Sequence, residues 1–322
     1  MDPLSDVLRV VRLNAAYFYL VEASAPWSVW AAAARELAPR ILPESEHLIS
    51  YHIMTSGKCW GGLQGQPQLL LQTGDVIVFP HGDPHFMSSE QGRRVGGDVD
   101  TASPERYPGT VVLGSGSPDA TFVCGFLGCD ANPFNPLLAA LPRCLHMPGG
   151  AGGWLSEFPR QVVAESRQGR VGADTMLTRM AELMFVEVVR RYLETLSAEQ
   201  SGWLAALRDP MIGAALSSLH AQPARAWTLA MLAHEVGSSR TVLAERFTTV
   251  VGVPPMLYLT QWRLQLAANL LASTTTKVAS IGAEVGYESE AAFSRAFKRA
   301  IGRSPADFRK TRQQPPAEIG GA

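Results

Sequence analysis

An internal repeat in the last hundred residues constrains the fold of this chain more than any other feature. Two glycines, Gly237 and Gly286, open the copies and lie 49 positions apart. The residues after them repeat at an offset of 50, as the pairs Phe247/Phe297, Gly252/Gly302, Pro255/Pro305 and Tyr258/Phe308. A fixed period of this length indicates two copies of one supersecondary unit.

Each copy predicts a helix, a glycine turn and a second helix. In the first copy, residues 229–236 precede Gly237, and Ser239 is a helix-capping residue placed before residues 240–250. The second copy has the same plan, with residues 278–285, Gly286, Ser289 and residues 290–300. Small residues, Ala233 and Gly282, let the paired helices cross closely. This order is typical of a helix-turn-helix, whose second helix enters the major groove of DNA.

A long helix is predicted between the two copies, over residues 255–272. Its apolar positions follow a helical spacing: Leu257, Leu259, Trp262, Leu266 and Leu270. Eighteen residues at 1.5 Å each span roughly 27 Å. Such a helix holds two recognition helices near one DNA turn apart, about 34 Å, so both can enter one face of the duplex.

The second helix of each copy divides into core and outward residues. Leu243, Phe247, Phe293 and Phe297 form the apolar stripe. The outward residues, predicted to contact DNA, are Ser239, Arg240, Thr241 and Glu245 in the first copy and Ser289, Glu290, Ser294, Arg295, Lys298 and Arg299 in the second. Arg240 and Arg295 are predicted to contact base edges, because a guanidinium pairs bidentately with guanine. Lys298, Arg299 and Arg303 are assigned to phosphates; solvated surface charge is the alternative for each.

Residues 208–312 resemble the DNA-binding domain of AraC/XylS-type transcriptional regulators. The matching positions include Ala267, Leu271, Ile281, Val285-Gly286-Tyr287, Phe293-Ser294-Arg295-Ala296-Phe297-Lys298 and Gly302-Arg303-Ser304-Pro305. The resemblance implies a regulator that binds double-stranded DNA, acts with RNA polymerase, forms a homodimer and responds to a small effector.

The first half predicts β structure. Runs of strand length start at residues 7–13 and 17–21 and continue at 47–54, 58–63, 68–71, 76–79, 110–113 and 120–126. Turn residues separate the runs, which favours a β-sandwich or small barrel. The stretch from Gly74 through Pro80-His81-Gly82 to His85 resembles the second motif of the cupin family, with Ser89 in place of its closing asparagine. The first cupin motif is missing, since Ser50 stands where its glutamate would be.

A substitute for the usual cupin metal cage is predicted from His52, His85 and a thiol, Cys124 or Cys59, with His52, His85 and Cys124 as the set we favour. Imidazole and thiolate ligands suit zinc or another soft divalent ion. The alternative is that these side chains line a small-molecule pocket or fill the core. Cys59 and Cys124 form a second candidate site, a thiol redox sensor. Because cupins include metalloenzymes, a metalloenzyme in the first domain is the alternative to a transcription regulator. If the protein is a regulator, as we expect, it has no catalytic residues.

The organisation predicted is α+β with two domains. We expect a cupin-like β-barrel over residues 1–150, a helical dimerisation or linker region over 151–204, an all-α double helix-turn-helix over 205–312, and a disordered tail over 313–322. In the linker region, Leu177, Met180, Met184 and Val188 form a stripe that packs on the barrel or on a second subunit.

Charge is distributed unevenly along the chain. From residue 205 onward 13 Lys/Arg stand against 8 Asp/Glu, a net charge of +5, whereas the preceding residues carry −6. The basic end suits a polyanion. No run of about eighteen apolar residues and no signal-peptide pattern occurs, so we expect a cytoplasmic protein without a membrane partner.

Overall fold

The computed structural model describes residues 2–313 except 12, 14, 44, 93–108, 132, 150–156, 169 and 198–199. The chain forms two compact units. The helical unit comprises Met1–Arg12, Asp130–Leu141 and Thr195–Ala322, and the sheet unit comprises Leu13–Cys129 and Pro142–Glu194. The units therefore alternate along the sequence, unlike the consecutive domains expected above. The expected disordered tail lies, from residue 314 onward, outside the described residues.

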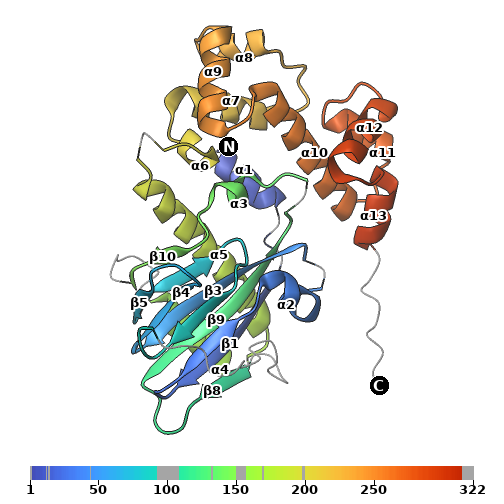
Figure 1. Cartoon of the computed structure of the whole chain (residues 1–322). Helices are drawn as coiled ribbons and strands as arrows, with labels where there is room; N and C mark the ends of the chain where they lie inside the picture. Colours follow the sequence, from blue (N-terminus) through green and yellow to red (C-terminus); the bar gives the residue numbers. More distant parts are fainter. Residues whose placement is uncertain are drawn as a thin grey trace. The chain divides into compact units, whose positions relative to one another are not determined.

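Ten strands form two sheets in the sheet unit. The larger sheet has the order β10-β6-β3-β9-β1-β8 and the smaller has the order β2-β7-β4-β5. The strands are β1 (Ala15–Ala23), β2 (Ser28–Ala31), β3 (His47–Ser56), β4 (Lys58–Leu63), β5 (Leu69–Gln72), β6 (Val76–Phe79), β7 (His85–Ser88), β8 (Gly109–Leu113), β9 (Ala120–Cys129) and β10 (Leu145–Met147). Figure 1 shows β3, β9 and β1 as the long neighbouring strands of the larger sheet.

The predicted strands from residue 17 to residue 126 are all strands in the structure, but the expected closed barrel is not formed. Among the described residues, no ladder joins the two sheets, which face each other as in a sandwich-like arrangement around a shared apolar core. Both faces of β3 and β9 are buried over most of their length. The composition of β9 is nearly continuously apolar and aromatic, whereas β3 also buries the polar residues Ser50 and His52.

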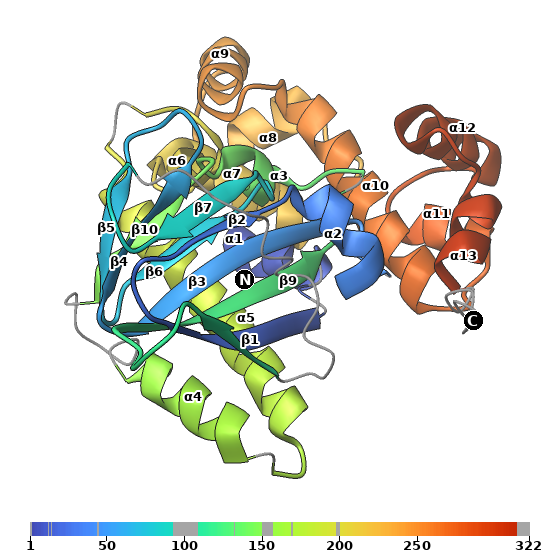
Figure 2. The same cartoon turned by 60° about the horizontal axis from the view of Figure 1, so that its bottom comes forward.

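Three helices accompany the sheets: α2 (Ala34–Ile41), α4 (Phe158–Gln168) and α5 (Ala173–Thr195). Figure 2 shows α4 and α5 next to each other. Leu177, Met184 and Val188 of the predicted stripe on α5 are buried within the unit. Two other apolar side chains of α5, Met176 and Leu183, are 54% and 58% exposed. The helix thus has a buried face and a second, exposed apolar edge.

The helical unit contains ten helices among the described residues. They are α1 (Pro3–Val10), α3 (Pro136–Ala140), α6 (Trp203–Ala206), α7 (Pro210–Ala221), α8 (Leu229–Glu235), α9 (Arg240–Val251), α10 (Pro255–Ser273), α11 (Val278–Glu284), α12 (Glu290–Ile301) and α13 (Pro305–Gln313). The first helix-turn-helix copy is α8 with α9, the second is α11 with α12, and α10 runs between them (Figure 1). On α10 Leu259 and Trp262 are buried as predicted, whereas Leu257 is 47% exposed.

The strand predicted over residues 7–13 is wrong, because Pro3–Val10 form α1. The Asp2 carboxylate accepts a hydrogen bond from the Ser5 backbone N–H at 2.9 Å, and Pro3 occupies the first turn. Leu4, Val7 and Val10 are buried at helical spacing. Local alternation of Val, Leu and Arg was outweighed by this capping signal at the start of the chain.

Segments from the first half of the sequence are integral to the helical unit. The Asn269 side chain of α10 donates to the Val10 carbonyl at 2.8 Å, and the Gln265 side chain accepts from the Phe134 backbone N–H at 2.9 Å. Arg312 of α13 lies 3.2 Å from the Asp130 carboxylate. Residues 2–11, 130–131 and 133–141 therefore complete a body whose main part begins at Thr195. No described helix is long and apolar enough to cross a membrane.

Candidate functional site

The glycine turns hold the two helix-turn-helix copies in the same geometry. Gly237 and Gly286 have φ values of +64° and +92°, in the region that favours glycine. A Cβ on Gly286 would lie 2.8 Å from Ala224 Cα, so a side chain has no room there. A Cβ on Gly282 would lie 3.1 Å from the Phe293 ring, which explains the small residue where α11 and α12 pack.

The second helix of each copy begins with a serine cap and ends with a left-handed glycine. The Ser239 hydroxyl accepts from the Val242 N–H, and the Ser289 hydroxyl accepts from the Ala292 N–H, both at 3.2 Å. Gly252 and Gly302 close the helices at φ +91° and +79°. The helices α9 and α12 are therefore short rigid segments with matching start and end positions.

Nine of the ten predicted DNA-contacting residues are exposed; Ser294 is half-buried. Leu243, Phe247, Phe293 and Phe297 are fully buried, as predicted. The two arginines predicted to contact base edges, however, lie on different faces of their helices relative to the buried stripe. Arg295 lies two residues from both buried phenylalanines of α12, on the opposite face of the helix. Arg240 is exposed because it begins α9, but it lies seven residues before Phe247 and hence on the same side of the helix as that ring.

Arg246 of α9 forms an ion pair that was not predicted from the sequence. Its guanidinium lies 2.7 Å and 2.8 Å from the Asp209 carboxylate, which also accepts from the N–H groups of Met211 and Ile212 at the start of α7. Asp209 therefore joins α9 to α7, and these hydrogen bonds, working against burial, lower its pKa. Neither Arg240 nor Arg295 makes an ion pair with another described residue. Their charges are available to an external partner.

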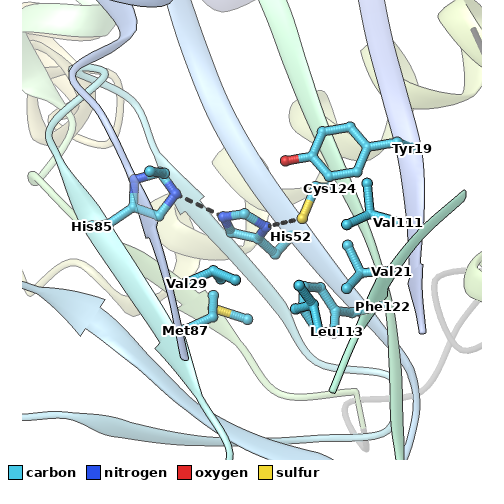
Figure 3. A pocket seen from close by; sticks show the side chains of 11 residues that line it. Tyr19, Val21, Val29, His52, His85, Met87, Val111, Leu113, Phe122 and Cys124 are labelled. Atoms are coloured by element: carbon cyan, nitrogen blue, oxygen red, sulfur yellow. Dashed lines mark hydrogen bonds between the residues drawn. The ribbon is translucent and has the colours of Figure 1, made fainter. Parts of the chain in front are cut away.

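A second site lies in the sheet unit, where strand register brings three predicted residues together. His52 of β3 is the direct partner of Cys124 on β9. His85 enters from β7 after the turn at Pro80-His81-Gly82, where Gly82 has φ +65°. His52 Nδ1 lies 2.8 Å from Cys124 Sγ, and His52 Nε2 lies 2.7 Å from His85 Nε2 (Figure 3). All three side chains are buried.

The hydrogen bonds fix the direction of the protons in this row. His85 Nδ1 lies 2.9 Å from the Asp83 carbonyl, which can only accept, so Nδ1 carries the proton. Burial lowers the pKa of His85 to about 4, so its Nε2 is an unprotonated acceptor at neutral pH. His52 then donates through Nε2 and accepts at Nδ1 from the Cys124 thiol. Burial lowers the pKa of His52 and raises that of Cys124, while a hydrogen bond from Tyr19 opposes the second shift.

The remaining walls are apolar except for the Tyr19 hydroxyl. The site is lined by Tyr19, Val21, Val29, Ala31, Met87, Val111, Leu113 and Phe122 in addition to the polar row (Figure 3). The cavity measures about 10 Å³, which is room for about one water molecule. A larger molecule can enter only if side chains or strands move apart.

The donors of the polar row do not converge on one point in this arrangement. His52 lies between the other two groups and turns a different ring nitrogen to each. Within the described ranges, no group of three or more His, Cys, Asp or Glu side chains is placed to hold a metal ion. A three-ligand zinc site would require His52 to rotate so that one nitrogen faces a point shared with His85 and Cys124.

Cys59, the other predicted redox residue, lies outside the row. Its Sγ contacts the Met54 Sδ at 3.4 Å in the apolar core. Burial raises the pKa of the Cys59 thiol to about 12. All four cysteines are free thiols. Because the thiolate is the reactive form, these surroundings slow direct oxidation of Cys59 and Cys124.

Comparisons with known proteins cover both halves of the chain. Residues 2–194 match the sequence family described as Cupin, and residues 232–311 match that described as a helix-turn-helix domain. An AraC-like transcription regulator of Streptomyces lividans is 33% identical over 314 residues, which is 96% of this chain and 98% of that protein. The HTH-type transcriptional regulator AlkR of Acinetobacter baylyi is 29% identical over 96% of this chain and 99% of its own length. A solved AraC-type regulator from Chromobacterium violaceum is 28% identical, with 34% of this chain and 98% of that chain covered and a TM-score of 0.32.

Proposed function

The chain belongs to the AraC-like transcription regulators, and we propose on that premise that α9 and α12 bind one specific DNA site under the control of a small molecule in the sheet unit. The observation that supports this most directly is the pair of capped helices with exposed polar faces, set at the two ends of α10. We propose no enzymatic activity, since the relatives are named as regulators.

The length of α10 supports simultaneous use of both helices. Its 19 residues span about 28 Å at 1.5 Å each. One turn of DNA is about 34 Å, so the helices would enter successive major-groove windows on the same face of the duplex. The basic charge of the chain from residue 205 onward supplies attraction to phosphates.

The apolar pocket of the sheet unit is the proposed effector site. Its lining suits a small, mostly apolar molecule with one polar group that bonds to the row of His52, His85 and Cys124. Since the cavity is nearly filled, occupation must displace surrounding side chains. A ligand shifts a conformational equilibrium only as far as its affinities for the two conformations differ. The conformation with displaced side chains has room for the ligand and the filled conformation does not, so the two affinities differ.

Two protein partners complete the proposal. A second copy of the chain would cover the exposed apolar edge of α5 formed by Met176 and Leu183. Size-exclusion chromatography with light scattering tests this, and Leu183→Glu is expected to convert dimer to monomer. RNA polymerase is the further partner, and the cytoplasm the compartment where the proposed DNA and polymerase contacts are made.

Specific DNA binding is tested by selecting duplexes from a random library with the full-length protein. We expect enriched sequences with two clusters of preferred bases about one helical turn apart. Enrichment of no sequence over the starting library, at several salt concentrations, would reject the proposal.

The effector site is tested by thermal unfolding in the presence of a panel of small apolar molecules. A ligand at 100 times its Kd stabilises the folded chain by about 2.7 kcal/mol. Val111→Trp fills the pocket, whereas Val112→Trp projects from the neighbouring, 67% exposed position of the same strand. A ligand that stabilises the wild type and Val112→Trp equally, and Val111→Trp much less, supports the site; equal stabilisation of all three contradicts it.

Two other signals are candidates for control of DNA binding through the same row of His52, His85 and Cys124. A bound zinc ion is tested by metal analysis of the untagged protein; loss of zinc from His85→Ala supports it, and its absence from wild type excludes it. Oxidation of Cys124, whose sulfur lies 2.8 Å from His52, is the other. We expect DNA binding by Cys124→Ser to be insensitive to hypochlorite or peroxide if that input operates, and Cys59→Ser to distinguish the two thiols.

A further inference from the structure

The helices α9 and α12 present opposite charges at the same position. The 50-residue offset pairs Glu245 with Arg295. Each lies two residues after one buried position and two before the next: Leu243 and Phe247 in α9, Phe293 and Phe297 in α12. Two residues correspond to about 200° around a helix, so both side chains stand opposite the buried stripe. Both are exposed.

Neither charge is neutralised within the described part of the chain. Glu245 makes no ion pair there, although a cation, Arg246, follows it directly. That guanidinium is already bound to Asp209 at 2.7 Å, on a different side of α9. Glu245 therefore keeps a free carboxylate on the face that the proposed DNA complex would bring to the groove.

Two further positions on these faces differ in the same sense, whereas the pair that opens the two helices, Arg240 and Glu290, differs in the opposite sense. Lys298 and Arg299 on α12 correspond to Thr248 and Thr249 on α9, whose hydroxyls donate to the backbone carbonyls of Ala244 and Glu245 at 2.7 and 2.9 Å. The face of α12 thus carries three cations with Arg295, and the face of α9 carries one anion. A carboxylate is repelled by phosphates, so its position on this face is unfavourable unless a base donates to it.

We propose that Glu245 is a specificity-determining residue that accepts a hydrogen bond from the exocyclic amine of a cytosine, while Arg295 binds guanine in the other half of the site. A carboxylate accepts from cytosine N4, and a guanidinium donates to guanine O6 and N7. The two half-sites therefore differ although the protein copies are repeats. An asymmetric site of this kind fixes the direction in which the regulator lies on DNA. This inference rests on the proposed DNA-binding function.

The test is random-library selection with full-length wild type, Glu245→Ala, Glu245→Arg, Arg295→Ala and, as a charge control outside both faces, Glu284→Gln. We expect Glu245→Ala to lose the cytosine preference in one cluster and keep the other cluster. Glu245→Arg is expected to prefer guanine at that position. Arg295→Ala should lose guanine in the opposite cluster, and the control should match wild type. Each contact discriminates against the wrong base by about five- to 150-fold.

Kd values on the selected duplex and its single-base variants quantify the result. Glu245→Ala should bind random DNA at least as tightly as wild type, because an anion has been removed. A cytosine preference that persists in both Glu245 variants, or equal weakening at every position, overturns the assignment. Failure of the wild type to enrich any sequence overturns the proposed function and this inference with it, whereas an unchanged pattern in the variants overturns the inference alone.

Discussion

The hydroxyl of Tyr258 makes two buried hydrogen bonds in the helical unit, so its removal should have a large and specific cost. It accepts from Trp203 Nε1 at 2.7 Å and lies 2.7 Å from His220 Nε2. Burial lowers the pKa of His220 to about 3, so this ring is neutral at pH 7 and accepts the tyrosine proton. One oxygen thereby joins α6, α7 and α10.

Tyr258→Phe removes that oxygen without creating a cavity. It leaves two buried polar groups, Trp203 Nε1 and His220 Nε2, without partners. Each unsatisfied group costs about 1–3 kcal/mol, so we expect a loss of about 3 kcal/mol in the free energy of unfolding. With a urea m value of about 2 kcal/mol/M, the midpoint should fall by about 1.5 M. Urea unfolding followed by tryptophan fluorescence measures it, because Trp262 stacks on His220 with centroids 4.1 Å apart.

Tyr287→Phe is the matched control in the same unit. Its hydroxyl is buried and has no hydrogen-bond partner among the described residues, so its removal is expected to be neutral or stabilising by up to about 1 kcal/mol. Equal midpoint shifts for the two variants, in either direction, would refute the reasoning that the two hydrogen bonds determine the cost.

Three further outcomes are expected. The folded-state pKa of His220, about 3, lies below its ordinary 6.5, so the unfolded chain binds more protons between these values. The free energy of unfolding should therefore fall as the pH is lowered from about 6.5 to about 3, and the slope in that window should lessen in His220→Gln, measured by urea unfolding at each pH. Gly302→Ala should cost about 1 kcal/mol, since its φ is +79° but its surroundings are open; Gly286→Ala should cost clearly more, because its Cβ would meet Ala224, and thermal unfolding of the two variants compares them. Iodoacetamide should modify the half-buried Cys144 before the fully buried Cys124, as mass spectrometry of the native protein would show; the reverse order would mean that the pocket opens readily.

The helix-turn-helix copies were predictable because their signals are local. Glycine, serine and aromatic spacing within twenty residues determined both turns, both caps and the buried stripe of α9 and α12. The repeat also aligns Glu245 with Arg295 at an offset of 50.

The remaining features depend on contacts between distant residues. His52, His85 and Cys124 are separated by 33 and 72 positions, and their row depends on the register of β3 against β9 and on the turn before β7. The sequence predicted that these three residues lie in one domain, but it did not show that His52 lies between Cys124 and His85 and hydrogen-bonds to both. Helix α1 was missed for a different reason: the apolar run after Val7 matches both periods, and the helices on which α1 packs, α3, α7 and α10, lie much later in the chain.

The alternation of the two units along the chain has a consequence for the order of folding. The helical unit combines residues 2–11 with residues after 195, so it must close a very long loop before it is complete. Pairing of β1 with β9 brings Ala15 opposite Gly128, and the Asp130 N–H then donates to the Val11 carbonyl at 2.9 Å. Once the sheet unit has folded, residues 11 and 130 are neighbours, and most of that loop-closure entropy has already been lost. We therefore expect the sheet unit to fold first during synthesis and to present two adjacent segments on which the C-terminal helices assemble.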